Sequence, residues 1–311
     1  MKYYLGIDGG GTKTTFLVAD ENGSIYYSDT TGSCDYLKQG FDGLTAVLKE
    51  GVDKIDVPIS YAFVGCTGYG DTEADRKPIE DAVKAALGDI PHKVGNDSEN
   101  ALAGALAGEE GINIIAGTGS MACGYSKEKG TIRCGGWHHA IGSDEGSAYW
   151  MGIRLLNEFT RQSDGRDEKT PLYDRLKEKL DISQDDGLIV RVIEEWDIDR
   201  KKIASLAPLV GSLVNEGDPH AEKILFDAAD ELADLAIAVY RRLGFTGDMP
   251  VTCTGGVFRM GETLTALLNE KLKKYNMHYE RPLFDPAAGA VILAMLSDGQ
   301  EINSQVRYNL E

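Results

Sequence analysis

Cysteine is scarce in this 311-residue sequence, and the cysteines that it has form no recognisable motif. They are scattered along the chain, and no two of them make a C-x-x-C pair: Cys34, Cys66, Cys123, Cys134 and Cys253. An odd number of isolated cysteines indicates reduced thiols that are buried as small apolar residues. The sequence therefore indicates neither a zinc site nor an iron–sulfur cluster.

Positive charge and long apolar runs are also in short supply. The chain has 32 lysines and arginines against 50 aspartates and glutamates, a net charge of −18, which argues against nucleic acid or an anionic membrane as a partner. No run of about eighteen apolar residues and no signal peptide is present, so we expect a cytoplasmic protein. The composition, 42% hydrophobic and 26% charged, is that of a soluble globular chain with room for two domains.

Glycine is concentrated in a turn near the N-terminus. Two strand-like apolar runs, 3–7 and 15–19, flank a polar segment. This segment contains Asp8, the three glycines Gly9, Gly10 and Gly11, and then Thr12 and Lys13. Exposed N–H groups in such a turn, together with the Thr12 hydroxyl, suit phosphate oxygens. Asp8, at the end of the first strand, could hold a hydrated Mg²⁺. The alternative is an ordinary hairpin with a flexible loop.

The following pattern predicts two related α/β domains. After a third strand at 24–28, helices at 41–52, 72–87 and 98–107 alternate with strands at 61–66 and 93–94, and Ser98 is placed to cap the last helix. A second strand–turn–strand unit then begins at residue 112, with Gly117, Thr118, Gly119 and Ser120 in its turn. This repeat suggests that each domain presents a phosphate-binding turn.

The second domain carries an addition. Residues 171–245 are helical in pattern, the sheet resumes at 250–254, and Gly255-Gly256 follows. We therefore predict a first domain at 1–111, a second at 112–297 with this helical insertion, and a tail at 298–311 that packs on the first domain. The Gly255-Gly256 pair could admit a flat base against the backbone, or it could be a tight turn.

Other polar residues also follow predicted strands. Asp97 ends a strand before a helix, where a carboxylate can take a proton from a hydroxyl group, although capping the helix is an equal alternative. Gly136, Trp137 and His138 could form a binding wall, or Trp137 could belong to a core. Asp144 precedes a helix, where acidic residues are favoured in any case. The chain has no P-loop, and the Gly117-x-Gly-x-x-Ala motif precedes a strand rather than a dinucleotide-binding helix.

In this order, these segments resemble the N-acetylglucosamine kinase family within the BadF/BadG/BcrA/BcrD ATPase group, which belongs to the actin, chaperone ATPase and sugar kinase superfamily. The resemblance covers nearly the whole chain. It rests on Gly6-Ile-Asp-Gly-Gly-Gly-Thr-Lys13, Asn96-Asp97, Ala116-Gly-Thr-Gly-Ser120, Gly135-Gly-Trp137, Asp144-Glu-Gly-Ser-Ala-Tyr-Trp150, Thr254-Gly-Gly-Val257 and Asp285-Pro-Ala-Ala-Gly-Ala290.

The resemblance implies two ribonuclease-H-like domains that close on ATP, Mg²⁺ and a sugar in a central cleft, in a molecule that forms a homodimer. Asp97 would be the general base on the sugar 6-hydroxyl. The implied nucleotide contacts are Asp8, Gly10, Gly11, Thr12, Lys13, Thr118, Gly119, Ser205, Gly255 and Gly256, with Asp8 near Mg²⁺ through water. The implied sugar contacts are Asp35, Asp97, Gly136, Trp137, His138 and Asp144.

The sequence departs from the family pattern around the sugar. Asp35 and Leu37 stand where kinases resembling the animal enzymes have Asn and Trp, and Met121 replaces another Asn. His138 replaces a glycine, and Ser143 is an extra residue. The leading hypothesis is an N-acetylglucosamine kinase. The alternatives are a glucosamine kinase, an ATPase that activates a CoA-ester dehydratase or reductase, and a catalytically silent sugar sensor.

Overall fold

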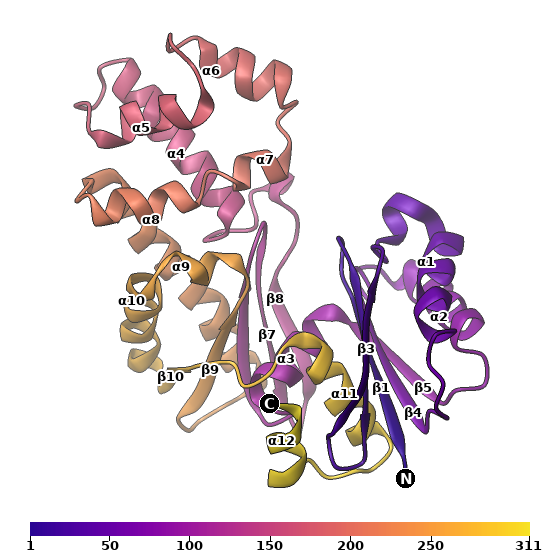
Figure 1. Cartoon of the computed structure of the whole chain (residues 1–311). Coiled ribbons are helices and arrows are strands. Elements are labelled where there is room, and N and C mark those ends of the chain that lie inside the picture. Colours follow the sequence, from indigo (N-terminus) through magenta and orange to yellow (C-terminus); the bar gives the residue numbers. More distant parts are fainter. The chain divides into compact units, whose positions relative to one another are not determined.

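The computed structural model describes residues 1–311, which divide into two compact units. The first unit contains Met1–Gly111, Tyr125–Thr131 and Arg281–Glu311, and the second contains Ile112–Gly124 and Ile132–Glu280. Each unit is built on a five-stranded sheet with helices packed against it, which confirms the predicted α/β class (Figure 1). None of the helices combines the length and apolarity needed to cross a membrane.

The sheet of the first unit has the strand order β3-β2-β1-β4-β5. Its strands are β1 (Tyr3–Gly9), β2 (Thr14–Asp20), β3 (Ile25–Thr31), β4 (Tyr61–Cys66) and β5 (His92–Asn96). The first three strands are antiparallel, whereas β4 and β5 run parallel to β1. Alternate residues of β1 serve two cores, because Leu5 and Ile7 pack on one face and Tyr4 on the other.

Helices cover both faces of this sheet (Figure 1). Helices α1 (Tyr36–Val52) and α2 (Glu73–Leu87) share one hydrophobic core with β1 and β4. On the other face, α11 (Pro286–Ser297) contacts β1 and α3 (Asp97–Leu106). The C-terminal helix α12 (Ser304–Leu310) buries Val306 and Leu310 in the core of that face.

Helix α11 lies in the first unit, whereas the sequence places residues 281–297 in the second domain. Small residues explain the difference, because they allow α11 to approach β1 very closely. A Cβ atom on Gly6 of β1 would lie 2.5 Å from the backbone nitrogen of Val291. This close packing of the two backbones places α11 in the first unit, although the preceding segment Ile132–Glu280 belongs to the second.

The sheet of the second unit repeats the arrangement of the first, with the order β10-β9-β6-β7-β8. Its strands are β6 (Gly111–Ala116), β7 (Ser120–Ser126), β8 (Gly130–Gly135), β9 (Met249–Thr254) and β10 (Met277–Glu280). In both sheets the first strand is central, the second and third follow on one side, and two parallel strands lie on the other. The repeat inferred from the glycine turns is thus confirmed.

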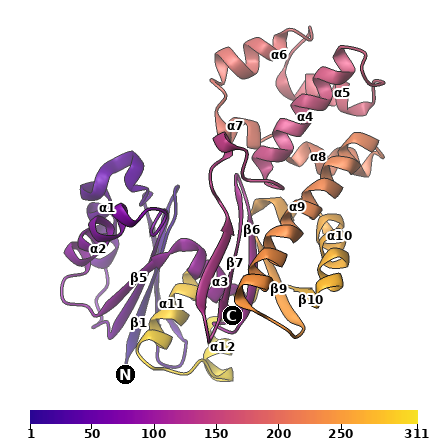
Figure 2. The ribbon, with the colours of Figure 1, turned by 180° about the vertical axis from the view of Figure 1, so that it is seen from behind.

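The second unit also contains the predicted helical insertion (Figure 2). The longer helices of the second unit are α4 (Ala148–Ser163), α5 (Pro171–Leu180), α8 (Pro208–Asn215), α9 (Pro219–Leu243) and α10 (Glu262–Leu272). The shorter helical segments are η1 (His139–Ile141), α6 (Gly187–Ile189), η2 (Val190–Glu195), α7 (Arg200–Ala204), η3 (Gly256–Met260) and η4 (Lys273–Tyr275). Helix α9 begins where the Asp218 side chain accepts hydrogen bonds from the His220 and Ala221 amides, and it ends at the left-handed Gly244.

Candidate active site

The glycine turn of the first unit joins β1 to β2 as predicted. The Gly10 amide donates a hydrogen bond to the carbonyl of Lys13 at 3.0 Å, which closes the turn. Thr12 and Lys13 are exposed, and Gly10 and Gly11 are partly so. The turn therefore presents a hydroxyl, an ammonium group and backbone N–H groups that an anion can reach.

Asp8 lies at the base of this turn and is held by Asn100 of α3. The Asn100 side-chain amide donates to Asp8 Oδ1 at 3.0 Å and to the Ile7 carbonyl at 3.1 Å. Burial raises the pKa of Asp8, the Asn100 hydrogen bond opposes this shift, and repulsion from Asp285 adds to it. Asp8 is therefore a fixed carboxylate in a place where negative charge is disfavoured.

Asp97 is the first residue of α3, and the helix cap is its neighbour Asn96. The Asn96 side chain accepts from the Ser98 amide, and Glu99 reaches back to the Asn96 amide, which completes a capping box. The prediction that Ser98 caps the helix is therefore wrong, and so is the alternative that Asp97 does so. Burial, with repulsion from Asp8, raises the pKa of Asp97 to about 6, as suits a general base.

The second glycine turn, between β6 and β7, is anchored to the start of α4. The amides of Ala148 and Tyr149 donate to the carbonyls of Gly117 and Thr118 at 2.9 and 3.3 Å. The Ser120 hydroxyl donates to the Glu145 carbonyl at 2.6 Å. These contacts fix the turn before any ligand binds.

A cavity of about 440 Å³ in the second unit brings together three residues that are far apart in the sequence. Thr118 of the turn, Ser205 after α7 and Gly256 after β9 all line it, and Lys201 does so as well. A Cβ atom on Gly256 would meet nothing within 4 Å. The preceding Gly255, at φ +107°, lies against the Ala116 backbone, where no side chain fits.

The loop after β8 presents its aromatic and imidazole rings to solvent. Trp137 is 73% exposed, which rules out the alternative that it belongs to a core, and Gly136 and His138 are exposed too. The extra Ser143 has a structural role here, because its hydroxyl accepts a hydrogen bond from the Trp137 amide at 3.2 Å. The hydrogen bond therefore holds the backbone of the loop, while the Trp137 and His138 side chains remain accessible to solvent.

Asp144 is the most buried of the predicted sugar contacts, with 3% of its surface exposed. Its carboxylate accepts a hydrogen bond from the Ser120 amide at 3.2 Å and pairs with Arg200 of α7 at 2.5 Å. The Arg200 guanidinium lies against Gly119, where an added Cβ atom would collide with it. Asp144 thus supports the second glycine turn.

Asp35 caps helix α1, which begins at Tyr36 and is interrupted at Gly40, rather than beginning at the predicted Phe41. Its carboxylate accepts from the Leu37 amide at 3.2 Å and forms an ion pair with Lys38. Asp35 Oδ2 also lies 4.0 Å from where a Cβ on Gly11 would be. The carboxylate is therefore beside the first glycine turn, with a cation already in contact.

Comparison with known proteins identifies the family of this chain. Residues 5–294 match the BadF/BadG/BcrA/BcrD ATPase family. The chain belongs to this family. An N-acetyl-D-glucosamine kinase from Dictyostelium discoideum is 31% identical over 94% of the chain and 98% of that protein. An N-acetylmuramic acid/N-acetylglucosamine kinase from Clostridium acetobutylicum is 34% identical over the same shares of both chains.

A solved structure shows the same fold. A proposed N-acetylglucosamine kinase from Chromobacterium violaceum superposes with a TM-score of 0.72 at 24% identity, covering 94% of this chain and 99% of the other. Membership of an ATPase family implies that this chain uses ATP.

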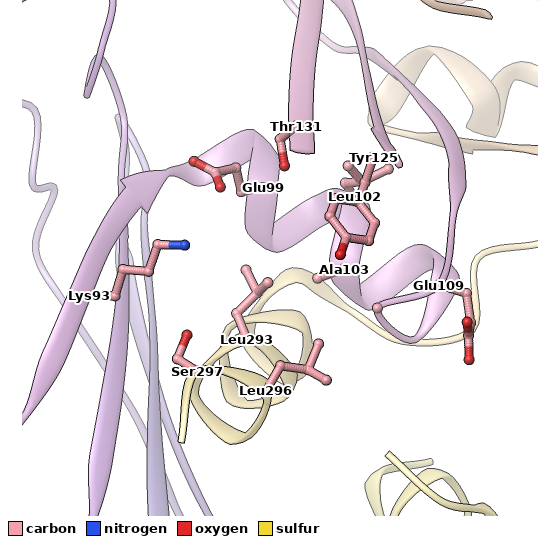
Figure 3. A pocket seen from close by; sticks show the side chains of 11 residues that line it. Lys93, Glu99, Leu102, Ala103, Glu109, Tyr125, Thr131, Leu293, Leu296 and Ser297 are labelled. Carbon is pink, nitrogen blue, oxygen red and sulfur yellow. The ribbon is translucent and has the colours of Figure 1, made fainter. Parts of the chain in front are cut away.

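A further cavity, of about 270 Å³, lies in the first unit and contains none of the predicted site residues. It lies between α3, α11 and the segment Tyr125–Thr131, and Lys93 and Glu99 both line it (Figure 3). This cavity lies against the helix that carries Asp97, because Glu99, whose side chain completes the cap of α3, also lines it.

Two residues in contact with the predicted site residues have no signal in the sequence. Asn100 lies in an alanine-rich helix and Arg200 in a charged segment, and neither belongs to a motif. Their roles depend on contacts with Asp8 and Asp144, which are 92 and 56 residues away along the chain. Sequence spacing cannot reveal such contacts.

Proposed function

We propose that this protein is an ATP-dependent kinase that phosphorylates the 6-hydroxyl of N-acetylglucosamine. The observation that carries the reaction is Asp97, a carboxylate with its pKa raised to about 6 that is not the N-cap of its helix. The sugar is inferred from the two relatives, each of which is named for N-acetylglucosamine.

In this proposal Asp97 is the general base. Its carboxylate accepts the proton of the 6-hydroxyl as that oxygen bonds to the γ-phosphorus, and the bond from this phosphorus to the β–γ bridging oxygen breaks. A pKa near 6 leaves Asp97 ionised at neutral pH, yet closer to that of the hydroxyl than an ordinary aspartate would be.

The cavity of the second unit is proposed to hold the nucleotide. The open backbone at Gly256 suits a flat base, Ser205 can contact the nucleotide, and Thr118 and Gly119 offer hydrogen-bond donors to phosphate. On the first unit, Gly10, Gly11, Thr12 and Lys13 offer a second set of donors.

Mg²⁺ fits the carboxylates of the first unit. Asp8 and Asp97 repel each other, burial raises both pKa values, and Asp285 adds further negative potential at Asp8. A divalent cation would relieve this repulsion and neutralise phosphate charge. Asp8, oriented by Asn100, is the residue proposed to hold it through water.

The sugar contacts are proposed to come from Asp35 and from the loop with Gly136, Trp137, His138 and Asp144. The Lys38 ion pair bears on the glucosamine alternative, because Asp35 already has a cation partner and no longer requires an ammonium group on the sugar. N-acetylglucosamine is therefore preferred. A homodimer remains a prediction from the family resemblance.

The experiment is a measurement of ADP release with MgATP and a panel of sugars. We expect N-acetylglucosamine to give the highest kcat/KM, with N-acetylmuramic acid, glucosamine and glucose as comparators. ADP release that no sugar accelerates would contradict the proposal and favour the ATPase or sensor alternatives.

A further inference from the structure

Arg200 places a cationic side chain against the second glycine turn, and neither a motif nor the family comparison points to it. It lies at the start of α7, and its guanidinium is packed against Gly119 and Asp144. The next residue, Lys201, lines the cavity that also contains Thr118. Arg200 is therefore placed beside the backbone that the proposed function assigns to phosphate.

The donors of Arg200 are only partly used. The guanidinium group has five N–H donors in a rigid fork. One Nη2 hydrogen bond goes to Asp144 Oδ2, whereas Nε is buried and has no hydrogen-bond partner. A buried donor without a partner is unfavourable, so this group is set up to bind an acceptor that the protein itself does not supply.

Stability alone does not explain the pair with Asp144. Asp144 adopts φ +72°, which is a strained conformation for a residue with a side chain, and its carboxylate is almost completely buried. The Arg200 side chain is 35% exposed, so solvent weakens its attraction to Asp144, and the cost of removing the Asp144 charge from water offsets what remains. Backbone strain and a buried carboxylate at one turn are more typical of a functional site.

We propose that Arg200 binds a phosphate group of the nucleotide, keeping Asp144 as its anchor. Asp144 Oδ1 holds the Ser120 amide and Oδ2 holds Arg200, so one carboxylate orients the turn and the guanidinium together. The remaining N–H donors of the fork are then available to the oxygens of a phosphate group bound beside Gly119. This inference rests on the proposed function and adds the residue that recognises the phosphate charge in the second unit.

The test is calorimetric titration of wild type and Arg200→Gln with MgADP and, separately, with adenosine. Loss of charge-assisted hydrogen bonds should weaken MgADP binding by roughly 10- to 100-fold, and adenosine affinity should stay within about twofold. Arg200→Lys keeps the charge without the fork and should recover part of the loss. Lys202→Gln removes a cation from the same helix whose ammonium group donates to the Glu195 carbonyl instead of contacting Gly119 or Asp144, and this variant should bind MgADP like wild type.

Unchanged MgADP affinity in a folded Arg200→Gln protein would overturn the inference, and so would equal losses for MgADP and adenosine. If Arg200→Gln does not fold, Arg200→Lys decides, since wild-type MgADP affinity in that variant would equally exclude fork binding. If the wild type phosphorylates a sugar and Arg200→Gln binds MgADP normally, only this inference is overturned and the proposed function stands. A wild type that binds no adenine nucleotide removes both the inference and the proposed function.

Discussion

At the scale of single residues, the first unit concentrates negative charge that its own fold does not neutralise. Burial raises the pKa values of both Asp8 and Asp97, and repulsion adds to each shift, from Asp285 at Asp8 and from Asp8 at Asp97. Surface aspartates such as Asp298, which pairs with Lys2, have lowered pKa values instead. The contrast indicates that Asp8 and Asp97 are retained for chemistry at the expense of stability.

We expect Asp97→Asn to stabilise the protein at neutral pH. The folded-state pKa of about 6 exceeds the ordinary value of 3.8, so the folded state retains the proton to higher pH. The free energy of unfolding therefore falls as pH rises from 3.8 to about 6 and stays lowered above that. Asparagine removes this effect, and the variant should gain about 1–3 kcal/mol at pH 8 but not near pH 4.

Urea unfolding without Mg²⁺ or nucleotide measures this difference. Asp298→Asn is the control of opposite sign, because the lowered pKa of Asp298 means that its charge stabilises the fold above the ordinary pKa. A loss of stability for Asp97→Asn at pH 8 would contradict the account of Asp97 as a disfavoured charge.

Asn100→Ala should weaken the response to Mg²⁺ as well as the fold. The variant removes hydrogen bonds to Asp8 and the Ile7 carbonyl from a completely buried site, so we expect it to lose about 2–3 kcal/mol of unfolding free energy. Since Asp8 loses its orientation, half-maximal activity should require several-fold more Mg²⁺. A Mg²⁺ titration of sugar phosphorylation measures this.

The matched control is Asn113→Ala, which removes an equally buried asparagine that donates to Thr254 in the second unit. It should be destabilised without a change in Mg²⁺ requirement. If both variants show the same Mg²⁺ dependence as wild type, Asn100 only supports the fold.

At the scale of elements, glycines determine how closely helices and strands approach. A Cβ atom on Gly289 of α11 would collide with the Asn100 carbonyl and lie 2.9 Å from the Gly104 Cα in α3. Helix α3 carries Asp97 at its first residue and Asn100 one turn later. The crossing of α11 and α3 thus fixes the position of the proposed base.

Gly289→Ala should therefore destabilise the protein by about 1–3 kcal/mol, because overpacking forces two backbones apart. Gly32→Ala is the control in the same unit, since its Cβ would make only an ordinary contact, 3.7 Å from Val47. Thermal unfolding compares the two variants. Equal stability would show that α3 and α11 can separate at little cost.

Helix boundaries also show what periodicity can and cannot predict. The long apolar stripe of α9 and its Asp-Pro start predict Pro219–Leu243 correctly, because local signals define both ends. The start of α3 was misassigned by one residue, since Asn96, Asp97 and Ser98 are all good caps. Only the capping box with Glu99 selects Asn96.

At the scale of the whole molecule, the repeated glycine turns predict the architecture well. Each turn follows the central strand of its sheet, and this is visible as a strand–turn–strand pattern at residues 3 and 112. The placement of α11 could not be predicted, because it depends on contacts between Gly6 and Val291 across most of the chain. For the same reason the sequence connects Ser205 with Thr118 and Gly256 only through the family resemblance, whereas the structure shows their common cavity.

The measurement that tests the central claim most directly is ³¹P NMR of MgATP and N-acetylglucosamine with wild type and with Asp97→Asn. Wild type should produce N-acetylglucosamine 6-phosphate and ADP in equal amounts. Asp97→Asn should be slower by roughly 10²- to 10⁴-fold while binding MgADP like wild type, because it cannot accept the hydroxyl proton. A wild type that forms no sugar 6-phosphate, or an Asp97→Asn protein that forms it at the wild-type rate, would contradict the account.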